Sequence, residues 1–386
     1  MPGVSFSDNG GMTSASHSSA AAEPFEGLRI RGVAKTFGAD TTVLNEIDLD
    51  VHPGELISLV GSSGTGKSTL LRIIAGLEEP SAGRVTYAGQ PLERGSVGVV
   101  FQRPILYPHL SVKDNILFPT RLGAFSGGVD MDYYRELLEA LKLEGLESRK
   151  PSQLSGGQAQ RVGIARALIR RAPVVLFDEP LASVDEEMSA SIRADIVRLH
   201  ERYGFTGLYV THDQNEALML GQRVAVMDAG YLVQVDTPER LLAHPHTLQV
   251  AKLMAAPALN LLALEDSEAL PAGCELAIRA TALHPVAADA AHSLPMQVLG
   301  HRHLVGGMLY RARLLEAVSL PLESRRASAG TELSARMYAR VRAGQELEFF
   351  IPDAQGSTVL SAGERMRLGV AVERCFLFSD GKRFYL

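Results

Sequence analysis

The chain has 386 residues, of which 46% are hydrophobic and 21% charged, and this is enough for two or three globular domains. Its formal net charge of −6 gives no sign of the strongly basic surface with which proteins bind nucleic acid or acidic lipid. The two cysteines, Cys274 and Cys375, fit a reducing compartment better than a disulfide scaffold.

The first 26 residues are rich in Ser, Ala and Gly and lack the basic start and apolar core of a secretory signal. We expect a disordered extension, with a cloning or start-site artefact as the alternative. No apolar run in the sequence approaches the roughly 18 residues that span a bilayer. The protein is therefore expected to be made and kept in the cytoplasm.

Ordered structure is expected from Leu28, where "LRIRGVAKTF" alternates apolar and polar residues as a half-buried strand does. The apolar run "ELISLVG" leads into "GSSGTGKST", and the helix "KSTLLRIIAGL" follows. "RAPVVLFDEP" and "GFTGLYVTHD" are further apolar runs, each placed after a helical segment. Strands that alternate with helices predict a parallel sheet whose two faces are covered.

A helical insert is expected between these strands. Tyr134, Leu137, Leu138 and Leu141 are spaced so that they form one apolar stripe on a helix. We assign a helical subdomain to about residues 105–170, with the Gly-rich residues 123–130 as a loop inside it.

The pattern changes toward the C-terminal part of the chain. Two short strands are expected around a turn at Ala229 and Gly230, followed by a helix with Thr237 as its N-cap and Pro238 at its first position. Beyond about Asn260, short alternating segments separated by Gly, Pro, Ser and Asp predict a small β-barrel or sandwich. The domains are therefore expected at residues 27–257 and 258–386, after an extension over residues 1–26.

"GSSGTGKS", residues 61–68, fits the phosphate-loop pattern G-x-x-x-x-G-K-[ST] in full. The glycines let backbone N–H groups close around phosphates, and Lys67 supplies a positive charge toward the terminal ones. The hydroxyl of Ser68 is suited to ligate Mg²⁺, and the helix that begins there adds its positive end.

"VVLFDEP" supplies the acidic half of such a site. Asp178, at the end of an apolar strand, is expected to hold Mg²⁺ through water. Glu179 comes next, where a carboxylate can polarise an attacking water or take its proton.

With these motifs in order, the chain resembles the ATP-binding cassette (ABC) ATPases from about Leu28 to Leu262. "LSGGQ", residues 154–158, resembles the family signature, and Gln102 in "VVFQRP" resembles the glutamine that touches Mg²⁺ and the attacking water. "ASVD" looks like the D-loop, in which Asp185 fits while Ala182 replaces the common serine. His212 resembles the switch histidine that contacts the γ-phosphate. Phe37 stands where the family has an aromatic residue, more often Tyr or Trp, that stacks on adenine.

The resemblance implies an α/β P-loop NTPase cassette with a helical subdomain, followed by an all-β, OB-like (TOBE or MOP) regulatory domain. It implies ATP and Mg²⁺ as cofactors, and ATP rather than GTP because no NKxD-type guanine motif is present. The implied catalytic residues are Glu179, His212 and Gln102, and the implied Mg²⁺ ligands are Ser68, Gln102 and Asp178. The implied nucleotide-binding residues are Phe37, Gly61, Ser62, Ser63, Gly64, Thr65, Gly66, Lys67, Ser68, Thr69, Ser155, Gly156, Gly157, Gln158 and Asp185.

Ser155, Gly156 and Gly157 open a helix, where backbone N–H groups can hold an anion. The resemblance implies that this anion is the γ-phosphate bound by the phosphate loop of a second copy, arranged head to tail. The helix after the signature also carries Arg161, Arg166, Arg170 and Arg171. We expect solvated and interdomain roles for these arginines and no nucleic-acid partner.

"FQRPILYPHLSVKDNI", "DTPERLLAHPHTLQVAKLMAAPALNLL" and "SAGERMRLGVAVERCFLFSDGKR" resemble the permease-facing stretch, the connector and the closing C-terminal repeat of importer ATPases. The implied function is the ATP-hydrolysing subunit of an importer, peripheral on the cytoplasmic side of the cell membrane. Its partners are a second cassette, a separate permease and, indirectly, an extracytoplasmic solute-binding protein.

A sugar or related organic solute is favoured, and polyamine, sulfate, molybdate and iron remain alternatives. A soluble ABC ATPase of translation or DNA repair is the remote alternative. Such proteins normally show two cassettes in one chain or a long heptad arm, and this sequence shows neither. The C-terminal domain either senses an oxyanion or a signalling protein, or only dimerises the subunit.

Overall fold

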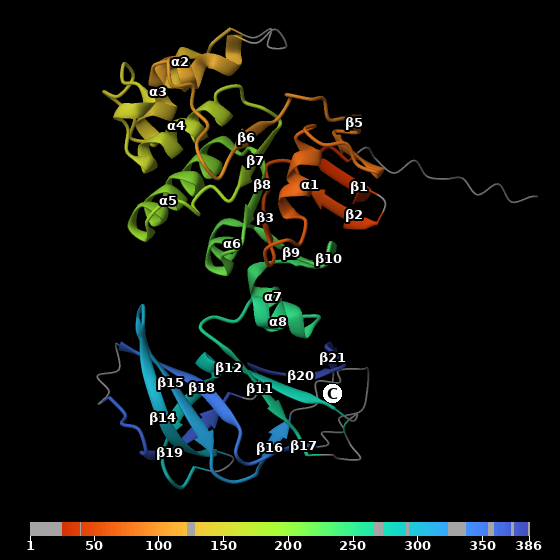
Figure 1. Cartoon of the computed structure of the whole chain (residues 1–386), viewed down its shortest axis with the longest axis vertical. Helices are drawn as coiled ribbons and strands as arrows, with labels where there is room; N and C mark the ends of the chain where they lie inside the picture. Colours follow the sequence, from red (N-terminus) through yellow and green to blue (C-terminus); the bar gives the residue numbers. More distant parts are fainter. Residues whose placement is uncertain are drawn as a thin grey trace, which may run out of the picture.

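The computed structural model describes residues 25–384, apart from residues 39, 122–127, 266–269, 271–272, 291–292, 323–336, 354–358 and 372–373. The expected disordered extension and most of the expected loop at 123–130 lie outside the described residues. Two sheets flanked by helices are followed by a region of antiparallel strands (Figure 1). The predicted fold class, an α/β cassette followed by a β-rich region, is thereby confirmed.

A six-stranded sheet forms the base of the candidate site. It consists of β3 (Leu56–Val60), β6 (Gly98–Val100), β7 (Val174–Asp178), β8 (Thr206–Thr211), β9 (Arg223–Asp228) and β10 (Tyr231–Asp236). The order is β10-β9-β3-β8-β7-β6, and every neighbouring pair except β10 with β9 is parallel. Because parallel strands end at the same edge of a sheet, the segments that follow β3, β6, β7 and β8 meet there.

A second, antiparallel sheet is formed by strands from the first part of the cassette. Its order is β2-β1-β4-β5, with bounds β1 Leu28–Phe37, β2 Thr41–Val51, β4 Ala82–Tyr87 and β5 Gln90–Pro91. Helix α1 (Lys67–Ile74) lies between the two sheets in the core, where Leu70 and Leu71 are buried against apolar residues of both. The strand predicted over residues 28–37 is present with the same bounds.

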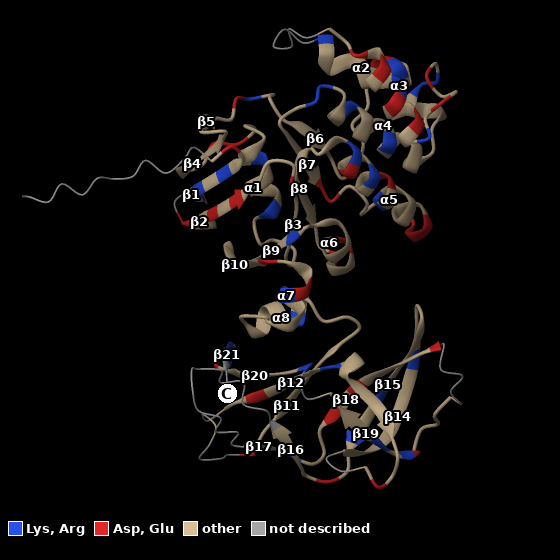
Figure 2. Cartoon of the chain, turned by 180° about the vertical axis from the view of Figure 1, so that it is seen from behind, with Lys and Arg blue, Asp and Glu red and all other residues tan. Residues whose placement is uncertain are grey.

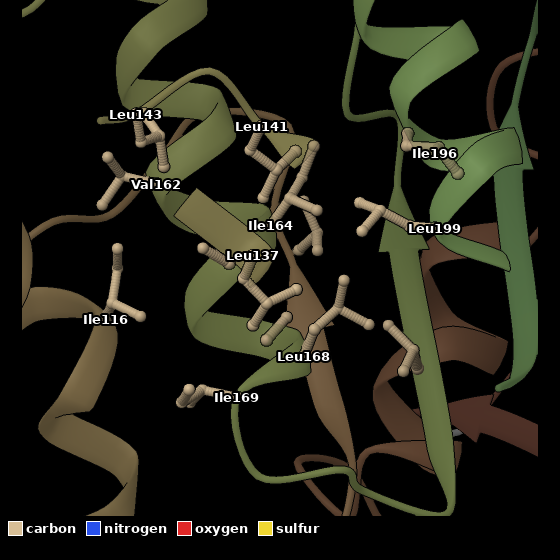
Figure 3. Packing of buried hydrophobic residues seen from close by; sticks show 14 of the residues in the cluster. Ile116, Leu137, Leu141, Leu143, Val162, Ile164, Leu168, Ile169, Ile196 and Leu199 are labelled. Carbon is tan, nitrogen blue, oxygen red and sulfur yellow. The ribbon is translucent and has the colours of Figure 1, made fainter. Parts of the chain in front are cut away.

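The helical region comprises α2 (Val112–Leu117), η1 (Phe118–Arg121), α3 (Met131–Ala140), η2 (Pro151–Gln153) and α4 (Gly156–Leu168). Figure 3 shows how its apolar side chains pack together with those of α5 (Glu186–Tyr203). The predicted stripe of Tyr134, Leu137, Leu138 and Leu141 is buried in this cluster. The burial of this stripe anchors α3 to α4 and so helps to position the helix that begins at the signature.

The sequence predicts solvated and interdomain roles for Arg161, Arg166, Arg170 and Arg171, but Arg161 is buried. Its side chain is 9% exposed, and Nη2 lies 2.9 Å from Oδ2 of Asp195, whose side chain is fully buried. The same guanidinium donates a hydrogen bond of 2.8 Å to the Ser191 hydroxyl. Arg198 also donates to Asp195 from the surface. A buried charge pair of this kind joins α4 to α5, because each charge is retained only where the other neutralises it.

We expect Asp195→Asn to lower the free energy of unfolding of the cassette by about 3–5 kcal/mol, because it leaves the buried guanidinium of Arg161 uncompensated. Urea denaturation followed by circular dichroism measures the change. Asp132→Asn is the matched control, since the Asp132 side chain is 87% exposed and its ion pair with Arg135 lies on the surface. Equal midpoints for the two variants would contradict a structural role for the buried pair.

Three short helices lie in the last part of the cassette, α6 between β8 and β9 and the other two after β10. They are α6 (Gln214–Leu220), α7 (Pro238–Ala243) and α8 (Leu248–Leu253). Thr237 caps α7 by accepting a hydrogen bond of 3.4 Å from the Arg240 N–H, with Pro238 at the first helical position, as the sequence predicts. No helix within the described ranges has both the length and the apolar character needed to cross a membrane.

The C-terminal strands form two larger antiparallel sheets and one pair. Their bounds are β11 Leu259–Ala263, β12 Glu275–Arg279, β13 Leu283–Val286, β14 Leu294–Leu304, β15 Gly307–Leu314, β16 Val318–Leu322, β17 Met337–Val341, β18 Glu346–Pro352, β19 Arg365–Val370, β20 Cys375–Ser379 and β21 Lys382–Phe384, with the short helix η3 at Ala280–Ala282. The orders are β11-β12-β20-β21, β13-β19-β14-β15-β18 and β16-β17. Their inward side chains share one apolar core.

The two parts of the chain are joined through the segment that contains α7 and α8 (Figure 1). The Leu248 N–H donates to the Gly381 carbonyl at 2.8 Å, and the Arg383 N–H donates to the His246 carbonyl at 3.1 Å. Ala251 of α8 packs with Phe376 and Phe378 of β20. The C-terminal sheet is thus tied to the last helices of the cassette by both backbone and side-chain contacts.

Candidate nucleotide site

The loop between β3 and α1 has a shape that requires glycine at two positions. A Cβ atom on Gly61 would lie 2.4 Å from the Met227 carbonyl oxygen. Gly66 has φ +97°, and a Cβ atom there would lie 2.7 Å from the Leu44 side chain. Ser62, Ser63 and Gly64 are exposed between these two fixed points. The result is a compact loop with open backbone N–H groups at the start of a helix, which suits an anion.

Lys67 lies inside this loop. Its Nζ donates hydrogen bonds of 2.7 Å to the Gly61 carbonyl and 2.9 Å to the Ser62 carbonyl, and the residue is 4% exposed. Burial lowers the pKa of the Lys67 ammonium, although the nearby carboxylates of Glu179 and Asp178 act in the opposite direction. The ammonium is therefore a desolvated positive charge that gains most from an anionic partner.

Two polar side chains meet beside this loop. The Ser68 hydroxyl donates a hydrogen bond of 3.2 Å to Oδ1 of Asp178, the last residue of β7. Burial raises the pKa of the Asp178 carboxyl above its ordinary value, against the lowering effect of this hydrogen bond. A hydroxyl and a desolvated carboxylate are oxygen donors of the kind that Mg²⁺ takes, so these residues fit the metal.

Glu179 and His212 form the second contact at this edge. Nδ1 of His212 lies 3.0 Å from Oε2 of Glu179, and their side chains are 58% and 22% exposed respectively. Glu179 has φ +44°, an unusual conformation that costs on the order of 1–3 kcal/mol for a residue other than glycine. Its N–H donates to the Val210 carbonyl at 2.9 Å, which fixes this turn against β8. The carboxylate is thereby directed toward the histidine.

A buried network behind His212 escaped the sequence analysis. Glu216 is 8% exposed, and its Oε2 accepts hydrogen bonds of 3.1 Å from the Tyr209 hydroxyl and 2.8 Å from the Thr211 hydroxyl. Burial, together with this carboxylate, raises the pKa of Tyr209 well above its ordinary value. The network fixes α6 to β8 on both sides of His212, so Glu216 is a positioning residue. In the sequence it is simply an acid in the first turn of a helix, and no pattern marks it as buried.

Gln102 follows β6 at the same edge of the sheet. Its side chain is exposed, and its carbonyl accepts a hydrogen bond of 3.1 Å from the hydroxyl of Ser183. The preceding carbonyl, that of Phe101, accepts one of 3.2 Å from the side chain of Gln160 in α4. The segment after β6 is therefore linked both to the stretch that contains Asp185 and to the helix that follows the signature.

The signature residues form the capped start of α4. The Ser155 hydroxyl accepts from the Gln158 N–H at 3.3 Å, and the Gln158 side chain accepts from the Ser155 N–H at 3.0 Å. A Cβ atom on Gly157 would lie 2.6 Å from the Met188 side chain, whereas one on Gly156 would meet nothing within 4 Å. The helix start is therefore held closely on one side by α5 and open on the other.

The structure does not bring this helix start to the phosphate loop of its own chain, since α4 and α1 lie well apart (Figure 1). It does bring Asp185 near the signature, because the Asp185 carboxylate caps α5 by accepting from the Met188 N–H at 2.9 Å. Met188 in turn packs against Gly157. The remaining residues that the resemblance implied lie on the phosphate-loop side.

On that side, the Thr65 hydroxyl donates to the Ser62 carbonyl at 3.0 Å, and Thr69 is half-buried in α1. Phe37 lies at the end of β1 and is 43% exposed. The Lys35 ammonium lies 4.9 Å from the centre of its ring. An exposed aromatic ring with a cation on one face remains available for stacking through its other face.

Comparison with known proteins adds to this geometry. The family described as "ABC transporter" matches residues 44–182. The sn-glycerol-3-phosphate import ATP-binding protein UgpC 1 of Rhizobium johnstonii is 46% identical over 241 residues, 61% of this chain and 65% of that protein. UgpC of Salmonella typhi is 42% identical over 266 residues, 66% of this chain and 74% of that protein. The matches thus span between just under two thirds and three quarters of these relatives.

A solved structure has a similar fold. CbiO1 from Clostridium perfringens, part of the ABC transporter complex cbiONQ, matches with a TM-score of 0.51 and 27% identity. The match covers 57% of this chain and 92% of that one.

Proposed function

This chain belongs to the family of ABC transporter ATP-binding proteins, and from that premise we propose that it hydrolyses ATP to drive solute import through separate membrane subunits. The observation that supports this function best is the single sheet edge at which the phosphate loop, Asp178, Glu179 and His212 meet. We divide the chain into a cassette at residues 27–257 and a regulatory domain at 258–386.

The phosphate loop binds the β- and γ-phosphates of ATP through its backbone N–H groups, and the Lys67 ammonium exchanges its loop carbonyls for phosphate oxygens. Ser68, Asp178 and Gln102 are the residues that would hold Mg²⁺, which supplies neutralising charge to the phosphates when bound. Phe37 stacks on the adenine ring with the face that Lys35 leaves open.

Hydrolysis requires a proton acceptor for the attacking water. Glu179 serves as this base, and the strained turn keeps its carboxylate at the end of β7. As the water oxygen bonds to the γ-phosphorus and the bond to the β-phosphate oxygen breaks, the water proton passes to Glu179. His212 contacts the γ-phosphate, and the Glu216 network holds it in place.

Two copies of the chain complete the site head to tail. The open helix start at Gly156, together with Ser155, Gly157 and Gln158, contacts the γ-phosphate held by the partner copy. Asp185, at the cap of α5, belongs to the same face. ATP binding closes the two copies, and hydrolysis lets them separate.

A loop between β6 and α2 is the surface that we assign to the permease. It exposes Ile105 (62%) and Tyr107 (38%). The fully buried Asn115 organises the loop, because its side chain accepts from the Tyr107 N–H at 2.7 Å and donates to the Tyr107 carbonyl at 3.1 Å. Rigid exposed apolar groups that follow Gln102 so closely are suited to transmit movement from the nucleotide to a membrane subunit.

The relatives named for sn-glycerol-3-phosphate import favour a small polar organic solute, a sugar or a sugar-like phosphate ester, over polyamines and inorganic ions. The chain then acts from the cytoplasmic side of the cell membrane.

Uptake in whole cells tests this function. We expect deletion of the gene to abolish uptake of radiolabelled sn-glycerol-3-phosphate or of a sugar, and a plasmid copy of the chain to restore it. A Lys67→Ala copy, made to the same level, should restore at most a few per cent, because ATP binding is lost. Unchanged uptake of a panel of sugars and phosphate esters in the deletion strain would contradict the proposal.

A further inference from the structure

A cavity of about 550 Å³ lies between the cassette and the C-terminal strands. Helices α6 and α7 line one side of it, and the segments around β12 and the start of β20 line the other. Figure 2 shows the same arrangement from behind, with α7 between α6 and the C-terminal strands. None of the residues assigned to ATP contributes to this cavity.

The C-terminal wall of the cavity contains a guanidinium that has no counterion among the described residues. Nε and Nη2 of Arg279 are buried and have no hydrogen-bond acceptor within the described part of the chain. Among the described residues, the guanidinium lies on the ring of Phe376, whose centre is 5.0 Å from Cζ. A second guanidinium, that of the exposed Arg374, lines the same cavity.

Burial, and next the like charge of Arg374 and Arg383, lower the pKa of Arg279 to about 10. Arg383 lies on Phe376 as well, 4.8 Å from the ring centre, and donates to the Ala243 carbonyl at 3.2 Å. Glu239 of α7 is the one carboxylate among the described lining residues, and it is not among the charges that act on Arg279. A buried positive charge with so little compensation is costly, and an anion would neutralise it.

We propose that this cavity binds a small phosphate-bearing anion, with Arg279 and Arg374 on the phosphate oxygens. Guanidinium groups suit this ligand because their N–H groups match the spacing of phosphate oxygens. Gln214 and Asn215 line the facing wall, and their side-chain amides can supply neutral donors. Leu218, Leu242 and Phe376 leave apolar surface for a carbon skeleton, which favours a phosphate ester over inorganic phosphate.

The bound anion connects the C-terminal strands to the switch region of the cassette. Gln214 is the first residue of α6 and comes two residues after His212. Asp213 caps the helix by accepting from the Asn215 N–H at 2.7 Å. An anion that holds α6 to Arg279 restrains the turn that carries His212, so it slows ATP turnover. This regulatory consequence rests on the proposed function, whereas anion binding does not.

Calorimetric titration of the full-length chain with sn-glycerol-3-phosphate, and separately with inorganic phosphate, tests the site. We expect saturable binding that weakens about tenfold or more in both Arg279→Met and Arg374→Met, because each removes a charge-assisted hydrogen bond. Arg365→Met is the matched control, since Arg365 is exposed on β19 and lies outside the cavity. Tighter binding of the ester identifies an organic phosphate as the ligand, and binding of inorganic phosphate alone identifies the free ion.

The phosphate loop also attracts anions, so the comparison between variants decides the matter. Equal binding by wild type, Arg279→Met and Arg374→Met, or no binding at all, would overturn the proposal. Arg279→Lys keeps the charge and removes the planar fork, so it separates loss of the ligand contact from loss of folding. We expect it to fold and to bind more weakly.

In the ATPase assay, the ester should slow ATP hydrolysis by the wild type and should not change the rate of Arg279→Met. A chain that binds the ester through Arg279 but hydrolyses no ATP would instead refute the proposed function and leave the site intact.

Discussion

We expect a chain that carries Glu179→Gln to bind ATP as tightly as the unaltered chain but to hydrolyse it at least about 100-fold more slowly, the lower end of what a general base contributes. The amide has the same shape as the carboxylate and keeps a hydrogen-bonding partner for Nδ1 of His212, 3.0 Å away in the unaltered chain. It cannot take a proton from the attacking water. Binding therefore survives, and the chemical step fails.

The slow step has a structural consequence. In the proposed mechanism ATP closes the two copies, and in this variant ATP is no longer consumed, so the variant should accumulate as a dimer after ATP is added. Phosphate release and size-exclusion chromatography, each with and without ATP, measure the two effects. Glu144→Gln is the control, because Glu144 is an exposed acid outside the nucleotide site. Ordinary turnover in the Glu179 variant would remove this residue as the base.

The local patterns of the sequence were sufficient to predict the elements around the site. An alternating or continuous apolar run identifies a strand, and glycines with Lys67 and Ser68 identify the loop after it. The parallel sheet then aligns the ends of β3, β7 and β8, so residues more than a hundred positions apart meet without any signal that names their contact. The family and the fold class are confirmed, while the roles of individual site residues remain proposals.

The contacts between helices could not be predicted in the same way. Arg161 has the spacing of a surface residue on a basic helix, yet Asp195, 34 positions later, neutralises it in the core. Gly157 reads as part of an anion-binding motif, and only the packed structure shows that Met188 excludes a side chain there. Such pairings depend on which helix faces which, and a periodic pattern fixes only the buried face of each helix.

The cavity between the cassette and the C-terminal strands could not be predicted from the sequence either. Its walls come from segments near residues 214, 239, 279 and 374, which no motif connects. Arg279 ends the short strand β12, and that it has no counterion among the described residues is a property of the assembled fold, which no local pattern predicts.

The proposed head-to-tail arrangement predicts that two defective chains restore a site when they are mixed. Lys67→Ala removes the phosphate-loop charge, and Gly156→Asp places a carboxylate where a phosphate is expected. The second change disturbs the fold little, because nothing lies within 4 Å of a Cβ atom on Gly156. Each variant alone has a defect in both sites of its dimer. A mixed dimer has one doubly defective site and one intact site, provided that the signature acts on the partner copy.

The amount of bound ATP shows how many intact sites a dimer has, provided that both variants also carry Glu179→Gln so that ATP is retained. Mixed dimers purified through two different affinity tags should keep about one radiolabelled ATP, whereas dimers of the parent variant Glu179→Gln keep about two. Either variant alone should keep almost none after gel filtration. If the signature acted within its own chain, mixing would leave every site with one defect and no nucleotide would be retained. The separation of α4, which begins at the signature, from α1, which begins at Lys67, within one chain favours the first result (Figure 1).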